Sequence, residues 1–452
     1  MKRNEKVVST PESSADGGQL LLVVCLLLPL AILFLLPGGG LFAGGIWFWL
    51  TLLLTWLLLW MILGSRSVSQ AAAEPEPRVL HESDQPPLIR ELMNVRTAEE
   101  EEGGVRIFRG RLRESAEEAF VRLKSTFGRE TVPMVQEDER TGSAILLLPR
   151  WFEKEALERR PRPWVNWLLF FLTILTTTWA GAAHQGVNLL QEPSRFAAGL
   201  PYSLGLLAIL GLHELGHYFA ARRHGMDVTP PYFIPVPFAL GTFGAFIKMK
   251  SPPENRRALF DVAVAGPLAG LMVAIPALLI GLRSSIILPG DVLTAPAFMG
   301  GTSAGSSILF ALLAKLSLGD ALQFGHILRL SPLAFAGWLG LFITALNLLP
   351  IGQLDGGHAA RAIFGSRVGS TISGVAMWSL FLLAIFVWPG LMMWALIVFF
   401  IAGRATPPLN DLTPVTTGRR WLGYATFLIL GLILIPLPHT LWTAAGMHYP
   451  YL

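Results

Sequence analysis

The sequence predicts a polytopic α-helical membrane protein with about eight or nine spans and one small α+β domain. Of its 452 residues, 52% are hydrophobic and only 15% are charged, which is unlike a soluble domain. The apolar residues form long runs, and one sizeable polar stretch, residues 65–162, divides these runs into two groups. The formal net charge of +4 is small and says little about nucleic acid, and we expect no nucleic-acid partner. The single cysteine, Cys25, excludes internal disulfides and cysteine metal clusters.

The chain begins with a polar leader, residues 1–18, for which we expect disorder. Two apolar runs follow within residues 19–64, Leu20–Leu36 and Ile46–Leu63, with a Pro-Gly-Gly-Gly turn between them. Basic residues before the first run are typical of a signal peptide. However, a small-residue cleavage site is missing from the right place, and the second run follows at once. We therefore predict two N-terminal membrane helices.

The polar stretch 65–162 predicts a compact α+β domain that follows a linker rich in Pro and Glu, residues 71–87. One helix is expected to begin at the capping box Ser115-Ala-Glu-Glu118, because apolar residues then recur at helical spacing. Three segments are expected to be strands: Val105–Leu112, Thr131–Gln136 and Ser143–Leu148. The stretch holds no cluster of chemical groups. Regulation or substrate capture is therefore favoured over catalysis, and a solvated cap that adds only stability is an equal alternative.

The rest of the chain predicts further membrane helices, in a core at residues 163–360 and a C-terminal group at residues 361–452. In chain order the expected helices are Trp164–Ala183, Leu200–Arg222, Leu259–Leu282, Leu333–Leu349, Ser370–Val387, Leu391–Ile401 and Trp421–Pro436. Leu391–Ile401 is short for a full span, so the count on the C-terminal side stays open. Residues 286–331 are mixed, and we expect Ser306–Leu316 to be amphipathic or partly embedded.

The arginines indicate an orientation, because Lys and Arg concentrate in the cytoplasmic loops of membrane proteins. Six of the basic positions that fall on one side of the predicted spans are Arg160, Arg222, Arg256, Arg361, Arg404 and Arg419. The opposite side holds only scattered arginines, such as Arg195 and Arg283. This distribution predicts an integral multi-pass membrane protein whose N-terminus, 65–162 domain and 223–258 loop are cytoplasmic.

One predicted membrane helix carries groups that can do chemistry. Residues 204–223 are mostly apolar, yet they contain His213, Glu214 and His217 in the pattern H-E-x-x-H. Histidines four residues apart share one face of a helix and can hold one metal ion, while the glutamate can take a proton from water. Ionisable groups inside a membrane helix are costly, so they indicate function. The alternative is two core histidines bonded to backbone carbonyls beside an incidental glutamate.

A catalytic zinc site needs a third protein ligand and one open position. Asp355 is the best candidate, because Pro350 and Gly352 end the preceding helix just before it. A carboxylate in apolar surroundings needs a partner, and a metal ion at the histidine pair would provide one. Asn347 could bond the substrate backbone or an oxygen in the site. A helix cap is the alternative role for Asp355, and His358 is either a fourth metal group or, more simply, a neighbour of the site.

Two motifs together are distinctive: H-E-L-G-H in one helix, and N-x-x-P-x-x-x-L-D-G, from Asn347 to Gly356, in a later one. With this pair the chain resembles the site-2 protease family of intramembrane zinc metalloproteases, from about residue 200 to about residue 360. The stretch Gly241-Thr-Phe-Gly-Ala-Phe-Ile-Lys-Met-Lys250 is similar to the family's membrane-embedded β-hairpin. The domain with Phe108-Arg-Gly-Arg-Leu-Arg113 resembles the cyanobacterial and chloroplast branch, although Arg111 stands where plant members carry Asn.

The resemblance implies roles for the residues already singled out. It implies Zn²⁺ as the cofactor, with His213, His217 and Asp355 as its ligands. It also implies that Glu214 is the general base and that Asn347 belongs to the site. The reaction would be hydrolysis of a peptide bond in or near the membrane helix of a membrane-anchored protein, as in regulated intramembrane proteolysis. The membrane would be a bacterial plasma membrane or a thylakoid membrane.

A substrate helix hides its carbonyl groups in its own hydrogen bonds, so it must unwind before it is cut. Gly241–Phe246 can offer an unpaired strand edge to the extended peptide, as in strand addition. The candidate substrate-binding residues on this edge are Gly241, Thr242, Phe243 and Gly244. The lipid bilayer is the other expected partner of the chain.

Three rival interpretations are open. A membrane zinc protease of the prenyl-peptide type also uses H-E-x-x-H, but its third ligand would be a glutamate, and none stands in that position. A transporter or ion relay could use the same buried His, Glu and Asp groups, although no inverted repeat is visible. A catalytically inactive binding homologue would not need the intact motif. The sequence does not determine the substrate, the activating signal or the oligomeric state.

Overall fold

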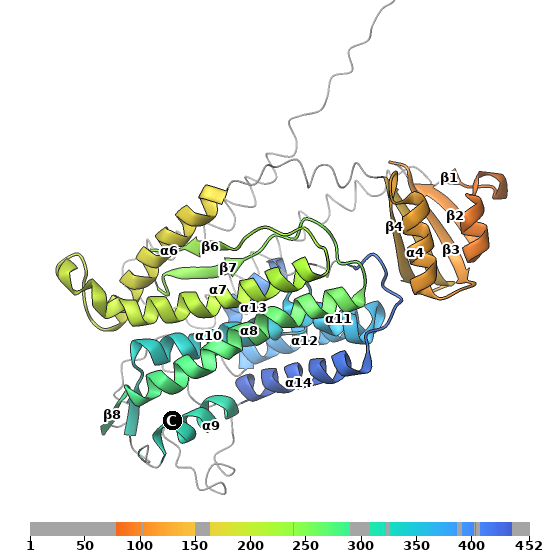
Figure 1. The fold of residues 1–452 in the computed structure, drawn as a ribbon. Coiled ribbons are helices and arrows are strands. Elements are labelled where there is room, and N and C mark those ends of the chain that lie inside the picture. Colours follow the sequence, from red (N-terminus) through yellow and green to blue (C-terminus); the bar gives the residue numbers. More distant parts are fainter. Residues whose placement is uncertain are drawn as a thin grey trace, which may run out of the picture. The chain divides into compact units, whose positions relative to one another are not determined.

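Figure 1 shows the fold in the computed structural model. The structure describes residues 78–101, 103–149, 163–237, 239–289, 307–319, 321, 326–386, 391–401, 403 and 407–435. The chain divides into two compact units, Met1–Pro75 and Glu76–Leu452, and every described residue belongs to the second unit. The predicted leader 1–18 and the two helices expected within residues 19–64 therefore lie outside the described residues.

Residues 78–149 form the predicted α+β fold. The sheet has the strand order β1-β2-β3-β5-β4, and each neighbouring pair is antiparallel. Its strands are β1 (Arg78–Val79), β2 (Met93–Glu101), β3 (Val105–Leu112), β4 (Thr131–Asp138) and β5 (Gly142–Pro149). The helices are η1 (Glu82–Asp84), α3 (Pro87–Leu92) and α4 (Ala116–Phe127). We call this part the α+β domain.

Helix α4 begins where the capping box predicts, because Ser115 Oγ accepts a hydrogen bond from the backbone N–H of Glu118. Its buried face packs Phe120 and Leu123 into one core with Phe108 of β3 and Ile145 of β5. This arrangement accounts for the helical spacing of the apolar residues in the sequence.

Strand β2 was not predicted, because its acidic run disguises the alternation of a strand. Two of its glutamates pair across to β3: Arg109 Nη1 lies 2.6 Å from Glu99, and Arg106 Nε lies 3.3 Å from Glu100. These cross-strand ion pairs let the acidic residues sit on the sheet. The expected linker 71–87 was wrong in its second half, where β1, η1 and the start of α3 lie.

Seven of the remaining helices agree closely in their bounds with the predicted spans, whereas the helices at 193–199 and 355–364 were not predicted. In chain order, the remaining helices are α6 (Pro163–His184), η2 (Pro193–Gly199), α7 (Leu200–Arg223), α8 (Arg256–Arg283), α9 (Ile308–Leu318), α10 (Pro332–Leu348), α11 (Asp355–Phe364), α12 (Ser366–Phe386), α13 (Leu391–Ile401) and α14 (Thr417–Leu434). Among the described residues, four helical segments are long and apolar enough to cross a membrane: Pro163–His184, Pro193–Arg223, Arg256–Arg283 and Ser366–Phe386. The predicted total of eight or nine spans stays a prediction.

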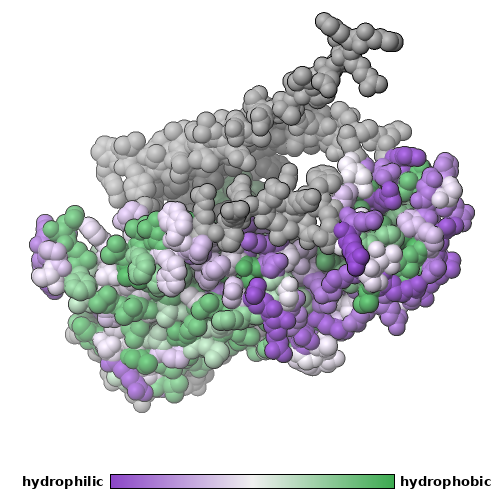
Figure 2. All heavy atoms as spheres, turned by 45° about the horizontal axis from the view of Figure 1, so that its top comes forward, coloured by the Kyte–Doolittle hydropathy of each residue, from purple (hydrophilic) through white to green (hydrophobic). Residues whose placement is uncertain are grey.

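The outer surface of these helices is apolar. On the face drawn in Figure 2, hydrophobic side chains gather over the helices and hydrophilic ones over the α+β domain. Large exposed apolar side chains on α6 include Trp164, Trp167, Phe171, Leu175 and Trp179. A contiguous apolar surface of this kind needs an apolar environment, which supports the assignment to a membrane.

Helices α7, α8 and α10 pack against one another and carry the main core. Small residues let the helix backbones approach, as is common between membrane helices. A Cβ atom added at Gly281 would overlap the backbone of Ala334, and one added at Gly337 would overlap Leu278. Between α8 and α10 the region expected to be mixed contains α9 and a small antiparallel sheet of β8 (Ile286–Pro289) and β9 (His326–Arg329).

The predicted hairpin between α7 and α8 is present. It pairs β6 (Tyr232–Pro235) with β7 (Thr242–Phe246), antiparallel, and packs against α6 and α7. Gly241 adopts a φ of 80° and lies so close to α6 that a side chain would overlap Thr177. The hydroxyl of Thr176 donates a hydrogen bond of 2.7 Å to the Gly241 carbonyl. These contacts fix the hairpin to α6.

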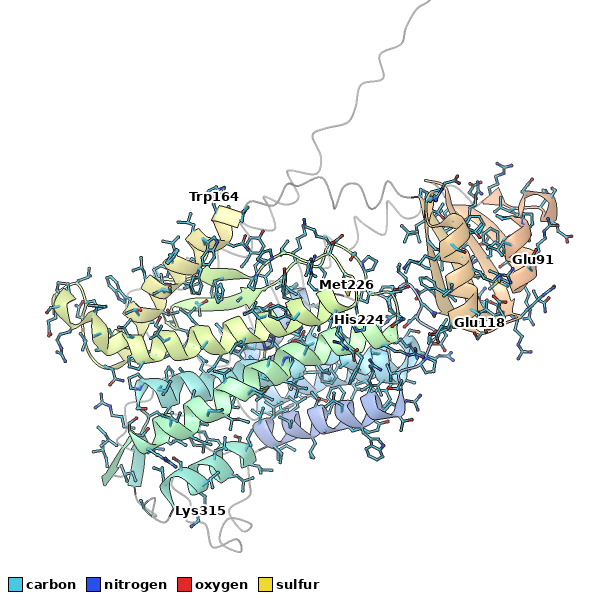
Figure 3. All side chains as sticks on the ribbon, viewed as in Figure 1. Glu91, Glu118, Trp164, His224, Met226 and Lys315 are labelled. Carbon is cyan, nitrogen blue, oxygen red and sulfur yellow. The ribbon has the colours of Figure 1, made fainter. Side chains whose placement is uncertain are left out.

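Three polar side chains tie the C-terminal end of α7 to its neighbours. His224, labelled in Figure 3 just after α7, lies 2.9 Å from the carboxylate of Asp261 on α8. Arg419 of α14 donates two hydrogen bonds of 2.7 Å to the same carboxylate. The ion pair between Arg419 and Asp261 therefore fixes the position of α14 relative to α8, next to the end of α7.

Candidate active site

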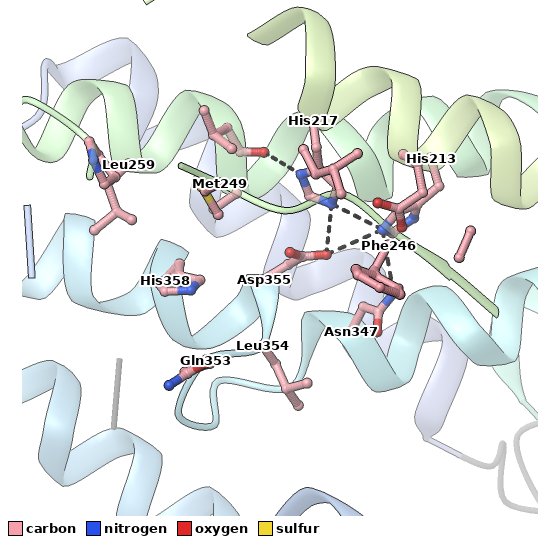
Figure 4. A pocket seen from close by; sticks show the side chains of 16 residues that line it. His213, His217, Phe246, Met249, Leu259, Asn347, Gln353, Leu354, Asp355 and His358 are labelled. Atoms are coloured by element: carbon pink, nitrogen blue, oxygen red, sulfur yellow. Dashed lines mark hydrogen bonds and ion pairs between the residues drawn. The ribbon is translucent and has the colours of Figure 1, made fainter. Parts of the chain in front are cut away.

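The two histidines of the H-E-x-x-H motif lie on one face of α7 and are buried. Their rings meet edge to face, and their Nε2 atoms are 3.1 Å apart. Asp355 approaches from α11, and its Oδ2 lies 3.3 Å from the Nε2 atom of His213 and 3.3 Å from that of His217 (Figure 4). The structure thus brings together the three residues that the sequence proposed as metal ligands.

The spacing of these three atoms fits a zinc ion. Zinc binds imidazole nitrogen and carboxylate oxygen at about 2.0–2.1 Å in a tetrahedron, which places neighbouring ligand atoms about 3.3 Å apart. The observed separations are 3.1, 3.3 and 3.3 Å. Among the described residues, His213, His217 and Asp355 are the group of side chains that could hold a metal ion. Three protein ligands leave a fourth position for water, as in catalytic zinc sites.

Neighbouring groups orient the two imidazoles. His217 Nδ1 lies 2.8 Å from the backbone carbonyl of Val262 on α8, so Nδ1 carries the proton and Nε2 is left free as a ligand. Asn347, near the end of α10, places its Nδ2 3.4 Å from His213 Nε2. The expectation that Asn347 belongs to the site therefore agrees with its position.

Glycines on α8 make room for the histidine rings. A Cβ atom at Gly266 would overlap the His217 imidazole, and one at Gly270 would press on the His213 ring. On the facing helix, a side chain at Gly216 would overlap the backbone of Ala265. Helices α7 and α8 can therefore meet closely enough for the Val262 carbonyl to reach His217. The sequence did not indicate these glycines, because their role depends on which helices face one another.

Asp355 reaches the site because α11 folds back on the loop that follows α10. The loop contains Gly352, at a φ of 48°, whose N–H donates to Ser373 Oγ at 2.8 Å. Side chains at Gly356 or Gly357 would overlap backbone atoms of this loop. These two glycines therefore allow a close backbone approach at the start of α11, of which Asp355 is the first residue.

Glu214 is buried beside the ligands and lines the same pocket. Its carboxylate accepts a hydrogen bond from the backbone N–H of Ile247, the residue that follows β7. This bond links the candidate base to the hairpin. A carboxylate held next to a metal-bound position is placed to receive a proton from water there.

The pocket brings in residues that the sequence analysis missed. Besides the ligands, Glu214, Asn347 and His358, its walls include Ala245, Phe246, Ile247, Met249, Pro253, Leu259, Gln353 and Leu354. His358 is buried, its Nδ1 makes no hydrogen bond to any residue that the structure describes, and it lies to the side of Asp355 in Figure 4. His358 is not part of the group of possible metal ligands. The position of His358 agrees with the view that it is a neighbour of the site.

The four candidate substrate-binding residues lie at the start of β7, outside the pocket walls. Gly241 contacts α6, and Thr242 Oγ1 donates to the Ile234 carbonyl at 2.8 Å, so both residues shape the hairpin. Phe243 is 72% exposed, and a side chain at Gly244 would meet open space. The part of the hairpin that reaches the pocket is the end of β7 and Ile247, one step further along the chain. Substrate contact by the four residues stays a prediction.

A match to a known protein family covers this same region of the chain. Residues 201–387 match peptidase family M50. The chain carries a peptidase family M50 domain. The matched residues include all three candidate ligands and Glu214, and the match confirms the resemblance to the site-2 protease family.

This chain has relatives among plant proteins. It is 32% identical over 356 residues to the probable zinc metalloprotease EGY2, chloroplastic, of Oryza sativa subsp. indica, a match covering 76% of this chain and 63% of that protein. It is 30% identical over 371 residues to the probable zinc metalloprotease EGY1, chloroplastic, of Arabidopsis thaliana, covering 73% and 66%. The chain thus spans less than two thirds of the length of these curated relatives.

The close fit of His217 against α8 leads to a prediction. Gly266→Ala adds a methyl group that overlaps the His217 ring, so the ring or the helix must move away from the Val262 carbonyl. We expect zinc affinity to fall by about ten-fold or more, as with other changes to groups that orient metal ligands. Competition with a chromogenic chelator measures this affinity. Gly374→Ala on α12, where a Cβ atom meets open space, is the matched control. Equal affinity in the two variants would contradict the packing argument.

Proposed function

We propose that this chain is a zinc-dependent endopeptidase that cuts a membrane-anchored protein in or near its membrane helix. One observation carries the proposal: His213, His217 and Asp355 converge with the spacing of zinc ligands, next to Glu214, between apolar helices. The M50 match and the relatives named as probable zinc metalloproteases support it. A glutamate third ligand, as in proteases of the prenyl-peptide type, is not needed, because Asp355 occupies that place.

The residues present have the parts needed for peptide hydrolysis. A zinc ion held by His213, His217 and Asp355 would act as a Lewis acid and lower the pKa of water to about 7. Glu214 takes a proton from the attacking water and gives it to the leaving amine, so one water is consumed for each peptide bond broken. Asn347 is placed to donate a hydrogen bond from its amide to a substrate carbonyl beside His213.

Strand β7 supports strand addition as the mode of substrate binding. Among the described residues, the small sheet contains only β6 and β7, so the second edge of β7 has no strand beside it. An unwound peptide that paired with this edge would be led towards Ile247 and Glu214. Backbone hydrogen bonds would hold the peptide extended while the exposed Phe243 and Phe246 contact its side chains.

The placement in the cell is part of the proposal. The apolar surface of the helices supports a multi-pass membrane protein, and the names of the relatives include the word chloroplastic, which agrees with a thylakoid or related bacterial membrane. The arginine distribution supports a cytoplasmic α+β domain and N-terminus. We divide the chain into a leader (1–18), two N-terminal helices (19–64), the 65–162 domain, the metalloprotease core (163–360) and C-terminal helices (361–452).

The chemical roles predict a split between metal binding and cleavage. Glu214→Gln should retain zinc and lose cleavage, because the amide cannot take up a proton. His213→Ala should lose both, because a ligand is removed. The measurements are zinc content and cleavage of a membrane-anchored reporter by the full chain in vesicles. A Glu214→Gln variant that still cuts at the normal rate would remove the base from the mechanism. An unaltered chain without stoichiometric zinc would favour an ion relay.

Strand addition predicts a specific effect at Phe243. Proline has no N–H to donate and its ring disturbs neighbouring strands, so Phe243→Pro should abolish cleavage while zinc remains bound at the distant ligands. Phe243→Leu, which keeps the N–H and an apolar side chain, is the matched control and should cut nearly normally. The measurements are the rate of reporter cleavage and the zinc content of both variants. Normal cleavage by folded Phe243→Pro would mean that substrate enters along another edge.

The proposed orientation predicts the accessibility of the polar domain. A protease-sensitive tag inserted within residues 71–77 should be protected in right-side-out vesicles and cut in inverted ones, because the positive-inside rule places this side in the cytoplasm. The opposite pattern would place the α+β domain on the far side. A tag in the 290–300 segment, expected on the opposite side, serves as the internal comparison.

A further inference from the structure

Asp411 is a buried charge that the catalytic chemistry does not use. It lies in the segment between α13 and α14 and has no exposed surface. Each of its carboxylate oxygens meets a different arginine: Arg256 Nε lies 3.1 Å from Oδ1, and Arg361 Nη2 lies 2.7 Å from Oδ2. Loss of one partner in a buried ion cluster leaves the others unbalanced, so the three side chains depend on one another.

The two arginines stand on the helices that build the metal site. Arg256 is the first residue of α8, less than two turns before Val262, whose carbonyl orients His217. Arg361 lies on α11, less than two turns after the third ligand, Asp355. Asp411 therefore joins the helix that orients one ligand to the helix that supplies another.

The α+β domain holds the Asp411 segment by strand pairing. Val135 of β4 donates its N–H to the Leu409 carbonyl at 2.7 Å and accepts the N–H of Asp411 at 2.9 Å. The side-chain amide of Gln136 donates to the Pro408 carbonyl at 2.7 Å. Since β4 is the end strand of the described sheet, the segment pairs with its outer edge through a parallel β-bridge between Val135 and Asn410.

The opposite edge of the same segment pairs with the approach to α8. Leu409 donates its N–H to the Pro253 carbonyl at 2.9 Å, and Asn410 donates to the Glu254 carbonyl at 2.9 Å. Pro253 is itself part of the pocket wall. The segment thus forms β-bridges with both the α+β domain and the approach to α8, and it presents the carboxylate of Asp411 to both arginines.

The side chain of Asn410 also fixes the segment through hydrogen bonds. Its buried side chain donates to the carbonyl of Ala116, the first residue of α4, at 3.0 Å. Its Oδ1 accepts the backbone N–H groups of Leu412 and Thr413, which closes a turn directly after Asp411. The segment is therefore fixed by the domain, by α8 and by its own turn.

We propose that Asp411 is a positioning residue of the metal site, which sets α11 against α8 and is itself held by the α+β domain through the paired segment 408–411. Metal ligands must keep their geometry within about 0.5 Å, and Asp355 sits on a short helix that starts after a loop. The two arginines that pair with Asp411 fix the position of α11 relative to α8. The inference rests on the proposed zinc site and requires no particular peptide substrate.

The test measures zinc affinity in the full chain purified in detergent, by competition with a chromogenic chelator. Asp411→Asn keeps the shape of the side chain but removes the charge that balances both arginines. We expect zinc affinity to fall by about ten-fold or more. Folding is followed by helix content and by the melting temperature of the metal-free protein. A residue needed only for stability would lower the melting temperature and leave the zinc affinity of the folded protein unchanged.

Two further variants make the result decisive. Arg361→Gln removes the link on α11 alone, leaves Arg256 paired with Asp411, and should also weaken zinc binding. If Asp411→Asn does not fold, the zinc affinity of Arg361→Gln tests the proposal instead. Lys124→Ala is the matched control, because it removes an exposed 2.9 Å ion pair between the domain and Glu254. Exposed pairs contribute little, so its zinc affinity should equal that of the unaltered chain.

The outcomes separate this inference from the proposed function. Normal zinc affinity in folded Asp411→Asn, or in Arg361→Gln if Asp411→Asn does not fold, would overturn the positioning role while the zinc site stands. An equal loss in Lys124→Ala would also overturn it, because any contact of the domain would then have the same effect. If the unaltered chain bound no zinc, the proposed function would fail and this inference with it.

Discussion

The burial of polar side chains between apolar helices is the constraint on which the rest of the structure depends. A polar group without a partner is costly in such surroundings, and helix α7 carries three buried polar side chains, His213, Glu214 and His217. His217 meets the Val262 carbonyl, Glu214 meets the Ile247 N–H, and Asp355 meets both histidines. Three elements must therefore contact α7 at the same height along its axis: α8, α11 and the end of the hairpin. This requirement brings the parts of the site together.

Close helix packing follows from the same requirement. A hydrogen bond from His217 to a backbone carbonyl of α8 is possible only if the two helices nearly touch, and Gly216 and Gly266 provide the space. Gly281 and Gly337 repeat the arrangement between α8 and α10. Helix α8 is thus in close contact with both the motif helix and the helix that leads to Asp355. Packing that is tight on both sides limits how far the ligands can move.

The sequence predicted what local patterns encode. Histidines at helical spacing, a proline and glycine before Asp355, and a capping box at Ser115 each specify structure within a few residues, and the structure agrees with them. The pairing of Val135 with Asn410 and the carbonyl of Val262 were not predicted, because backbone groups are identical in every residue. Gly266 and Asp411 likewise gain meaning only from residues far away in the chain. Strand β2 was hidden because its charges are neutralised by partners on β3.

The origin of the ligands from distant segments has a consequence for folding. His213 and His217 share α7, whereas Asp355 follows α8 and α10 and lies on α11. An ion bound to all three would act as a cross-link that closes a long loop of chain containing the hairpin and the three intervening helices α8, α9 and α10. Such a closure reduces the entropy of the unfolded chain, so binding energy is transferred to the fold as a whole. Chelation would then loosen the association of these helices as well as stopping the chemistry.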